Sequence, residues 1–343
     1  MTDEHEEYAE EPQVIDPLEA LELERIEYGE RLASVYLQSS GELLTCAKLE
    51  PDWLVPNAVP AGAINFIVGK PGASKSWAAY DLACAVVQRR DWMGLGVPTV
   101  NEGASVFILN FDNPHSECAR RFLRLGLTAA DNLWVHSWGA HTPPEPFPAV
   151  LQLPDAFEPL EAMVYAKRPV LIVVDSLRQA HTGDESSSQE MALIMAQLKR
   201  FAAYGAAVVI VHHTRKNDGA MRGSTEIEAT ADSIADVEKE DAQVSLVSWR
   251  KTRGWDMAES TITIRLIDEG DRTYVRGGMS LTQLIREAGP LSRSDIGKLL
   301  KLSQGQTKKI VERALERGVV AEKRDGQGGR LIELVEITRN EIT

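Results

Sequence analysis

The stretch that most constrains the fold is an apolar segment, Ile64 to Val68, followed by a Gly- and Pro-containing turn and then by Lys75 and Ser76. A helical pattern begins immediately after them, at Trp77. A strand that leads into a glycine loop, a Lys-Ser pair and a helix is the arrangement of a phosphate-binding P-loop. Glycines let backbone N–H groups point at phosphate oxygens, and the helix N-terminus adds partial positive charge. The sequence therefore predicts an α/β fold with a nucleotide site.

The predicted phosphate cradle consists of Gly69, Lys70, Pro71, Gly72, Ala73, Ser74, Lys75, Ser76 and Trp77. Within it we expect Lys75 to contact the β- and γ-phosphates of ATP and the hydroxyl of Ser76 to bind Mg²⁺. The usual pattern is G-x-x-x-x-G-K-[ST], and Ser74 stands where that pattern has its second Gly. An ordinary strand-to-helix turn with a capping Ser is the alternative interpretation of these residues.

Composition limits the classes of protein that fit. The chain has 343 residues, 43% hydrophobic and 26% charged, as expected of a globular protein with more than one domain. No apolar run approaches the ~20 residues of a membrane helix, and the acidic N-terminus lacks the apolar region of a secretory signal. Cys46, Cys84 and Cys118 are not clustered, which favours reduced thiols over a disulfide or zinc framework. We therefore expect a cytoplasmic protein with no membrane partner.

The net charge of −14 is distributed unevenly. Residues 1–40 carry twelve Asp or Glu and two Arg, whereas residues 280–343 carry twelve Lys or Arg and nine Asp or Glu. A chain this acidic binds the phosphate backbone of nucleic acids poorly through bulk charge alone. We expect any nucleic-acid contact to be local, or to be shared by several subunits.

Hydrophobic periodicity divides the chain into three predicted regions. Residues 1–45 predict an acidic disordered tail and an amphipathic helix that ends near Tyr36. Residues 46–277 alternate apolar strands with helices, which predicts a P-loop core: a doubly wound, mainly parallel sheet with an antiparallel edge. Residues 278–343 predict three helices and a hairpin, the composition of a small winged helix-turn-helix domain.

Polar residues end three of the predicted strands of the core: Asp112, Asp175 and the pair His212 and His213. Open α/β sheets bind ligands at the carboxyl ends of their strands. We predict that Asp175 holds Mg²⁺ as a Walker-B residue, with a turn Asp as the alternative, and that Asp112 orients the attacking water. The two histidines are predicted to sense the γ-phosphate, or else to be solvent-facing strand ends.

Two further groups of basic residues are predicted to act outside this pocket. Lys251 and Arg253 lie on a strand and turn beyond the sheet core, where they are better placed to reach a neighbouring subunit's nucleotide than their own. The candidate DNA-binding residues of the C-terminal domain are Lys308, Lys309, Arg313, Lys323, Arg324 and Arg330. A protein–protein adaptor is the alternative role for that domain.

From about residue 50 to 276, the chain resembles the RecA-like hexameric ATPases of the RepA-like plasmid and phage helicase group, which are AAA-type P-loop ATPases. The segments that carry the resemblance, in chain order, are 52–55, 69–76, 110–114, 173–176, 212–216, 221–224 and 251–253. The resemblance implies that Asp112 matches the catalytic carboxylate, which is usually Glu, and that His212 and His213 match the sensor. It implies further that Lys251 and Arg253 supply a finger to the neighbouring subunit.

The resemblance also places Arg222 near a subunit boundary and implies an ATP- and Mg²⁺-dependent hexameric motor, a helicase or translocase of a plasmid or phage. Single-stranded DNA would then pass through a central channel. A nucleotide-gated, DNA-binding regulatory ATPase with weak hydrolysis is the alternative. It is favoured by Ser74, by the short carboxylate of Asp112 and by a loop at 177–190 that has no aromatic residue for base stacking. A recombination mediator with the same core is a third possibility.

Overall fold

A computed structural model describes residues 17–37, 39–45, 48, 51–138, 154–215, 221–223, 225–239, 244–253, 261–268, 272–278, 280–316, 318–326 and 328–335. The chain divides into two compact units, Met1–Glu50 and Pro51–Thr343. The predicted domain boundaries after residues 45 and 277 stay predictions.

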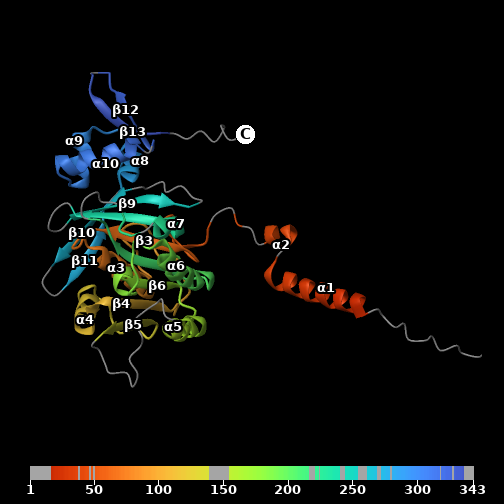
Figure 1. The fold of residues 1–343 in the computed structure, drawn as a ribbon. Helices are drawn as coiled ribbons and strands as arrows, with labels where there is room; N and C mark the ends of the chain where they lie inside the picture. The colour runs from red at the N-terminus through yellow and green to blue at the C-terminus, as the bar shows by residue number, and fades with distance from the viewer. Residues whose placement is uncertain are drawn as a thin grey trace, which may run out of the picture. The chain divides into compact units, whose positions relative to one another are not determined.

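The first unit contains helices α1 (Pro17–Tyr36) and α2 (Ser40–Thr45), shown in Figure 1. The predicted amphipathic helix ends at the expected residue. Its apolar side chains at Leu21, Ile26 and Leu32 are exposed within this unit. The predicted disordered tail lies outside the described residues.

The second unit is built around a nine-stranded sheet whose order is β11-β10-β9-β8-β3-β7-β6-β4-β5 (Figure 1). Its strands are β3 (Ile64–Gly69), β4 (Val106–Pro114), β5 (Leu133–Trp138), β6 (Leu171–Asp175), β7 (Ala207–His213), β8 (Ser233–Lys239), β9 (Val244–Thr252), β10 (Thr261–Asp268) and β11 (Thr273–Gly277). Strands β8, β3, β7, β6, β4 and β5 pair in parallel, and β9 to β11 form an antiparallel edge. The predicted α/β fold with a mainly parallel sheet is confirmed. A separate pair, β1 (Trp53–Val55) and β2 (Val59–Pro60), precedes the sheet.

Helices cover both faces of this sheet, because the strands are apolar on both faces. The helices are α3 (Lys75–Gln88), α4 (His115–Arg124), α5 (Pro154–Lys167), α6 (Ser188–Ala203) and α7 (Thr225–Thr230), with a 3₁₀ turn, η1 (Leu177–Gln179). Successive strand residues alternate between the faces: Ile67 packs with α3 and α4, whereas Phe66 and Val68 pack with α5, α6 and α7. The central strands β3, β6 and β7 are therefore buried on both faces, and their ends remain for a ligand.

Strands β8 and β9 form a wall with different neighbours on its two faces. Val237 and Val247 belong to the hydrophobic cluster around α3, and the hydroxyl of Ser245 reaches the P-loop carbonyl of Ala73 at 3.4 Å. On the other face, Leu246 belongs to the hydrophobic cluster of the C-terminal helices. The pairing of Glu238 with Leu246 puts that glutamate on the same side.

The C-terminal module comprises α8 (Leu281–Ala288), α9 (Arg293–Leu300), α10 (Gln304–Glu316) and a hairpin of β12 (Val320–Arg324) and β13 (Arg330–Leu334). Ser280 and Ser292 accept hydrogen bonds from backbone N–H groups in the first turns of α8 and α9, as N-cap residues do. Ser303 and Gln306 bond reciprocally at the start of α10, which is a capping box. These elements follow the predicted order, while the winged helix-turn-helix itself stays a prediction.

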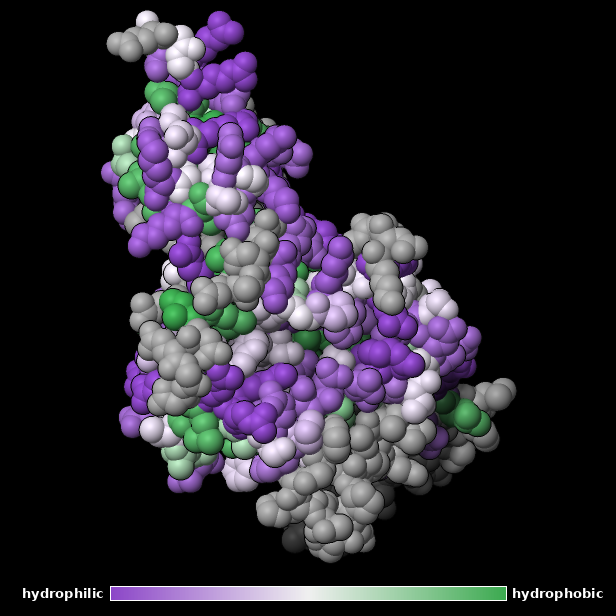
Figure 2. All heavy atoms as spheres, turned by 90° about the vertical axis from the view of Figure 1, so that its left-hand side faces the viewer, coloured by the Kyte–Doolittle hydropathy of each residue, from purple (hydrophilic) through white to green (hydrophobic). Residues whose placement is uncertain are grey.

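The surface of this module is mostly hydrophilic on the face that Figure 2 presents. Among the residues that the structure describes, no helix has both the length and the apolar character needed to cross a membrane.

Candidate nucleotide site

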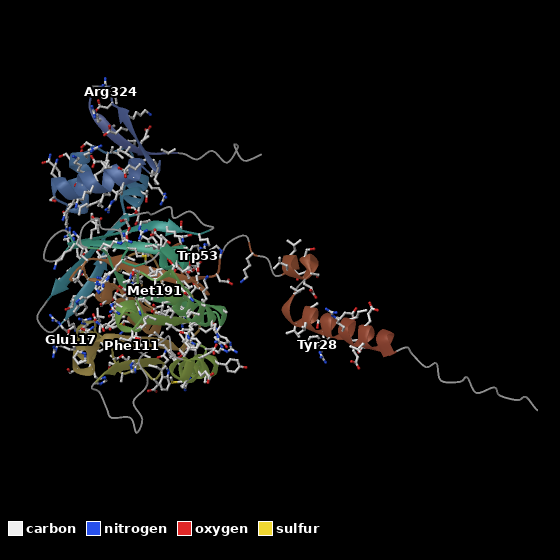
Figure 3. The ribbon with its side chains drawn as sticks, in the orientation of Figure 1. Tyr28, Trp53, Phe111, Glu117, Met191 and Arg324 are labelled. Atoms are coloured by element: carbon white, nitrogen blue, oxygen red, sulfur yellow. The ribbon has the colours of Figure 1, made fainter. Side chains whose placement is uncertain are left out.

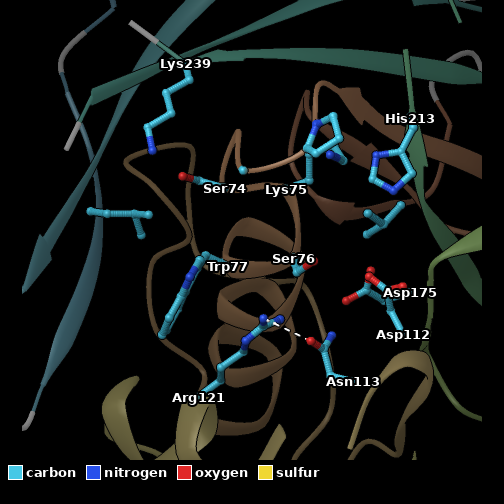
Figure 4. Close-up of a pocket in the computed structure, with 14 residues that line it drawn as sticks. Ser74, Lys75, Ser76, Trp77, Asp112, Asn113, Arg121, Asp175, His213 and Lys239 are labelled. Carbon is cyan, nitrogen blue, oxygen red and sulfur yellow. Dashed lines mark hydrogen bonds between the residues drawn. The ribbon is translucent and has the colours of Figure 1, made fainter. Parts of the chain in front are cut away.

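A pocket of about 340 Å³ opens at the N-terminal end of α3, where several parallel strands end (Figure 4). Its lining residues are Pro71, Gly72, Ser74, Lys75, Ser76, Trp77, Asp112, Asn113, Arg121, Asp175, Val211, His213, Lys239 and Leu266. The sequence predicted nine of these as site residues: Pro71, Gly72, Ser74, Lys75, Ser76, Trp77, Asp112, Asp175 and His213. The remaining lining residues come from α4 and from strands β4, β7, β8 and β10.

Three small residues of the cradle, Gly69, Gly72 and Ser74, differ in the steric or backbone constraint at their positions. A Cβ atom added to Gly69 would lie 2.3 Å from the carbonyl oxygen of Val237, so the close approach of β8 requires glycine there. Gly72 has φ +76°, a conformation that glycine adopts without strain. Ser74 has φ 73° and ψ 14° and makes no side-chain cap hydrogen bond. This serine therefore adopts a left-handed conformation that favours glycine, the residue type that the usual motif carries at its position.

Lys75 is 4% exposed at the floor of the pocket. Its Nζ donates to the carbonyl oxygen of Lys70 at 2.9 Å, across the loop. Burial lowers the pKa of Lys75 to about 8, and the negative charges of Asp175 and Asp112 oppose that shift. An anion in the cradle would stabilise the charged amine in the same way, so the site favours a phosphate.

Asp175 ends β6 and is 1% exposed. Burial raises the pKa of Asp175, while the neighbouring hydroxyls of Ser76 and Tyr80 lower it. These hydroxyls lie close, yet neither carboxylate oxygen has a hydrogen-bond partner of good geometry among the described residues. A buried carboxylate without such partners is costly unless a cation or a donor completes it.

The side chains of Ser76 and Asp175 are suited to binding a Mg²⁺ ion. Hydroxyl and carboxylate oxygens are the donors that Mg²⁺ prefers, and one or two protein ligands suffice when phosphates complete the shell. Among the described residues, no group of three or more His, Cys, Asp or Glu could enclose a metal by itself. Ser76 and Asp175 would therefore hold Mg²⁺ together with a nucleotide.

Asp112 lies at the end of β4, exposed and next to Asp175 (Figure 4). The negative charge of Asp112 contributes to the raised pKa of Asp175 and opposes the lowered pKa of Lys75. Its carboxylate thus interacts electrostatically with Lys75 and with Asp175 and is still accessible to water, as a residue that orients an attacking water must be.

Arg121 is a pocket residue that the sequence interpretation did not include. It lies on α4, its side chain is 17% exposed, and its Nη2 donates to Oδ1 of Asn113 at 3.2 Å (Figure 4). Its Nε donates to Oε1 of Glu117 at 3.1 Å. The guanidinium carbon lies 5.8 Å from the ring centroids of both Trp77 and Tyr80. Its Nη1 is buried without a hydrogen-bond partner in the described part of the chain.

A signal for Arg121 did exist in the sequence. It follows Asp112 by nine residues, across a turn and into the helix that begins at His115. Only the packing of α4 against α3 shows that the helix turns this arginine back toward the pocket.

The two predicted sensor histidines face opposite sides of β7, as neighbours on a strand do. His213 lines the pocket, and its pKa is lowered by burial and by the charge of Lys75. His212 is completely buried on the other face, where its Nε2 donates to the carbonyl oxygen of Arg222 at 2.8 Å. Burial lowers the pKa of His212 to about 4. Only His213 is therefore placed to meet a phosphate.

Arg222 lies behind the pocket rather than in it. Its Nε forms an ion pair with Oε2 of Glu185 at 2.8 Å, and its backbone N–H donates to the carbonyl oxygen of His213 at 3.0 Å. Glu185 is 6% exposed, and burial raises its pKa although Arg222 opposes this shift. Through His213, Arg222 is thus connected to the pocket by one backbone hydrogen bond.

Lys251 and Arg253 lie at the end of β9, outside the pocket of their own chain. The Nζ of Lys251 donates to the carbonyl oxygen of Glu228 at 2.6 Å, and Nη2 of Arg253 donates to that of Ala229 at 2.6 Å. Arg253 also pairs with Asp232 at 3.1 Å. Both cations therefore satisfy backbone carbonyl groups at the end of α7, where positive charge is favourable.

The predicted DNA-binding residues fall into two groups. On α10, Lys308 pairs with Glu312 at 3.7 Å, while Lys309 and Arg313 face Glu238 of β8. The hairpin residues are Lys323, Arg324 and Arg330, and all three are exposed.

A comparison with protein-family models agrees with this geometry. The model of a family described as an AAA domain matches residues 33–219. The chain belongs to this AAA domain family. The family consists of P-loop ATPases with a RecA-like core, so membership implies nucleotide binding, typically with Mg²⁺. The AAA domain match includes the P-loop, Asp112, Asp175 and both histidines, and it ends before Arg222, Lys251 and Arg253.

Proposed function

We propose that the protein is an ATP-hydrolysing, oligomeric motor that acts on DNA, a helicase or translocase of a plasmid or phage. The observation that carries the proposal is the buried carboxylate of Asp175, without a good hydrogen-bond partner among the described residues, in the same pocket as Lys75 and Asp112. This set supplies a phosphate cradle, a metal holder and a water-orienting group, which ATP hydrolysis requires.

Each residue has a defined part in the proposed reaction. The amine of Lys75 leaves the carbonyl oxygen of Lys70 and donates to the phosphates. Asp112 accepts a hydrogen bond from the attacking water and aligns it with the γ-phosphorus. Mg²⁺ held by Ser76 and Asp175 would neutralise charge on the phosphates.

The transition state is stabilised by positive charge beside the γ-phosphate, and among the described residues Arg121 is an arginine that lines the pocket. We propose that Lys251 and Arg253 add charge from a neighbouring subunit. Their position outside their own pocket supports that role, and their hydrogen bonds to the end of α7 must be exchanged for phosphate contacts when the subunits meet.

A second candidate function is a nucleotide-gated DNA-binding regulator with slow hydrolysis. Asp112 is one methylene shorter than the Glu that the resemblance leads us to expect, and the basic face of α10 contacts the ATPase sheet. In this function, ATP would control a DNA contact rather than drive translocation.

The decisive experiment measures ATP turnover with and without single-stranded DNA for the wild type, Lys75→Ala and Arg253→Ala. The motor predicts DNA-stimulated turnover that both substitutions abolish. Arg250→Ala is the matched control, because Arg250 lies on the same strand and pairs with Glu228 and Asp236 near α7. Turnover lost equally in the Arg250 variant would mean that the loss reflects the packing of α7.

Mixing inactive subunits tests the shared site. Lys75→Ala and Arg253→Ala subunits, combined in one assembly, form some interfaces in which Lys75 and Arg253 are both present, and they should recover part of the turnover. ATP binding without turnover, together with duplex binding that survives Arg253→Ala, would favour the regulator and exclude the motor.

A further inference from the structure

The basic face of α10 is occupied by the ATPase sheet. Nη2 of Arg313 contacts Oε1 of Glu238 at 2.5 Å, and its Nη1 donates to the hydroxyl of Ser248 at 3.1 Å. Nζ of Lys309 lies 4.0 Å from Oε2 of the same glutamate. A second contact joins Arg265 of β10 to the carbonyl oxygen of Lys301 at 2.6 Å. The module is thus fastened to the sheet through α10 and the end of α9.

This attachment restricts how the module can meet nucleic acid. A recognition helix reads bases by inserting an unobstructed face into the major groove, whose width is about that of one helix. The face of α10 with Arg313 is instead against β8 and β9, beside the buried Leu246. While these contacts persist, α10 does not present Lys309 and Arg313 to a groove.

The hairpin presents a different arrangement of charge. Arg324 and Arg330 are directly opposite each other in the register of β12 and β13. Like charges at such a pair destabilise a hairpin, so the fold alone gives no reason for two arginines there. Arg324 is exposed at the tip of the hairpin (Figure 3), and the Arg330 side chain is 70% exposed.

A third arginine and one glutamate complete this surface. Arg293, at the start of α9, pairs with Oε1 of Glu322 at 2.8 Å, and Arg330 lies 3.6 Å from Oε2 of the same carboxylate. One carboxylate therefore serves two guanidinium groups, and Arg324 adds a third positive charge beside them. Exposed ion pairs of this kind contribute only about 0–1 kcal/mol, so a phosphate group can replace the glutamate as their partner.

We propose that Arg293, Arg324 and Arg330 form a phosphate-contacting surface through which the module binds the backbone of duplex DNA, while α10 serves as its attachment to the ATPase. This inference rests on the proposed DNA-associated function and names the surface involved. Because phosphate contacts carry no base information, the binding is expected to be independent of sequence.

The test measures binding of the full-length protein to a fluorescent 20-base-pair duplex at several salt concentrations. Arg324→Ala/Arg330→Ala should weaken binding at least tenfold and reduce the slope of log K against log salt by about 2, since each phosphate contact contributes about 0.9. Lys308→Ala tests the alternative interface on α10, the helix that the proposal excludes, because Lys308 is a basic residue of α10 whose side chain is 66% exposed. It should change affinity less than twofold.

Thermal unfolding separates a binding role from a structural one. Removing one of two opposed like charges should leave the melting temperature of Arg324→Ala unchanged or higher, whereas a structural role predicts a lower one. Wild-type duplex affinity in the double variant, or a larger loss in Lys308→Ala, would overturn the inference. DNA-stimulated ATP turnover in that double variant would show that the proposed function stands even if the hairpin surface fails. Binding of acidic polypeptides in place of duplex DNA would also overturn it.

Discussion

The substitution Ser74→Gly isolates the most unusual residue of the phosphate cradle. Ser74 has φ 73° and ψ 14°, and its side chain makes no cap hydrogen bond, so glycine would lose no contact at the N-terminus of α3. A left-handed conformation costs a residue with a Cβ about 1–2 kcal/mol. Replacing Ser74 by glycine removes this cost. Part of the benefit, about 0.5–1 kcal/mol, is lost again because glycine has greater conformational freedom in the unfolded chain. The expected net stabilisation is therefore about 0.5–1 kcal/mol.

This strain is present without a nucleotide, so its removal should act on folding and not on ATP binding. We expect the melting temperature of Ser74→Gly to rise by about 1–3 °C, and the Kd for ATP to change less than about twofold. Ser74→Ala is the matched control: it removes the hydroxyl, keeps the Cβ and should leave stability within about 0.5 kcal/mol of the wild type. A less stable glycine variant, or a tenfold change in ATP affinity, would refute this reasoning.

Three further predictions concern residues of the ATPase core. Affinity for ATP should fall as the pH rises above about 8, by up to tenfold per pH unit, because Lys75 loses its proton there and must regain it to contact phosphate. Isothermal titration calorimetry between pH 7 and 9.5 measures this affinity, and an affinity that does not change with pH would contradict the lowered pKa of Lys75. The pKa of His212 is about 4 in the folded chain, against an ordinary value of 6.5, so the unfolded state binds more protons between these two pH values. The free energy of unfolding should therefore fall as the pH drops from 6.5 to 4, by roughly 3 kcal/mol in total. Urea unfolding at pH 7 and pH 4.5 tests the slope, which His212→Gln should flatten. Arg121→Lys should reduce kcat at least tenfold with a smaller effect on the Kd for ATP, since the guanidinium group belongs to a residue that lines the pocket. Arg120→Ala, an exposed neighbour that also pairs with Glu117, should leave kcat unchanged, and equal losses in both variants would point to disruption of α4.

The sheet was predictable because long apolar runs and glycine turns mark parallel strands without reference to distant contacts. The strand that ends at Asp175 is apolar up to that residue, and the structure buries all five of its residues. Two elements lacked such a signal. Helix α5 contains Pro159, which disfavours a helix interior. Strand β8 ends in Glu238 and Lys239 and resembles a charged loop in sequence.

The candidate site was predictable where a local motif suffices, as for Lys75 at the end of the P-loop and Asp175 at the end of a strand. The placement of His212 behind the pocket also follows from strand alternation, because adjacent side chains point to opposite faces. Arg121 and Lys239 could not be assigned, since each reaches the pocket from an element whose packing the sequence does not specify. The contact of Arg313 with Glu238 joins residues 75 positions apart, and local pattern carries no information about it.

The wall formed by β8 and β9 has a consequence for how the molecule unfolds. Val237 and Val247 bury one face in the ATPase core, and Leu246 buries the other in the C-terminal module. Because the two hydrophobic cores share these strands, neither can melt without exposing apolar surface of the other. Calorimetry of residues 51–343 should therefore show one cooperative heat-absorption peak. A protein that ends at residue 278 should be less soluble, because the face of β9 that carries Leu246 would be exposed to water.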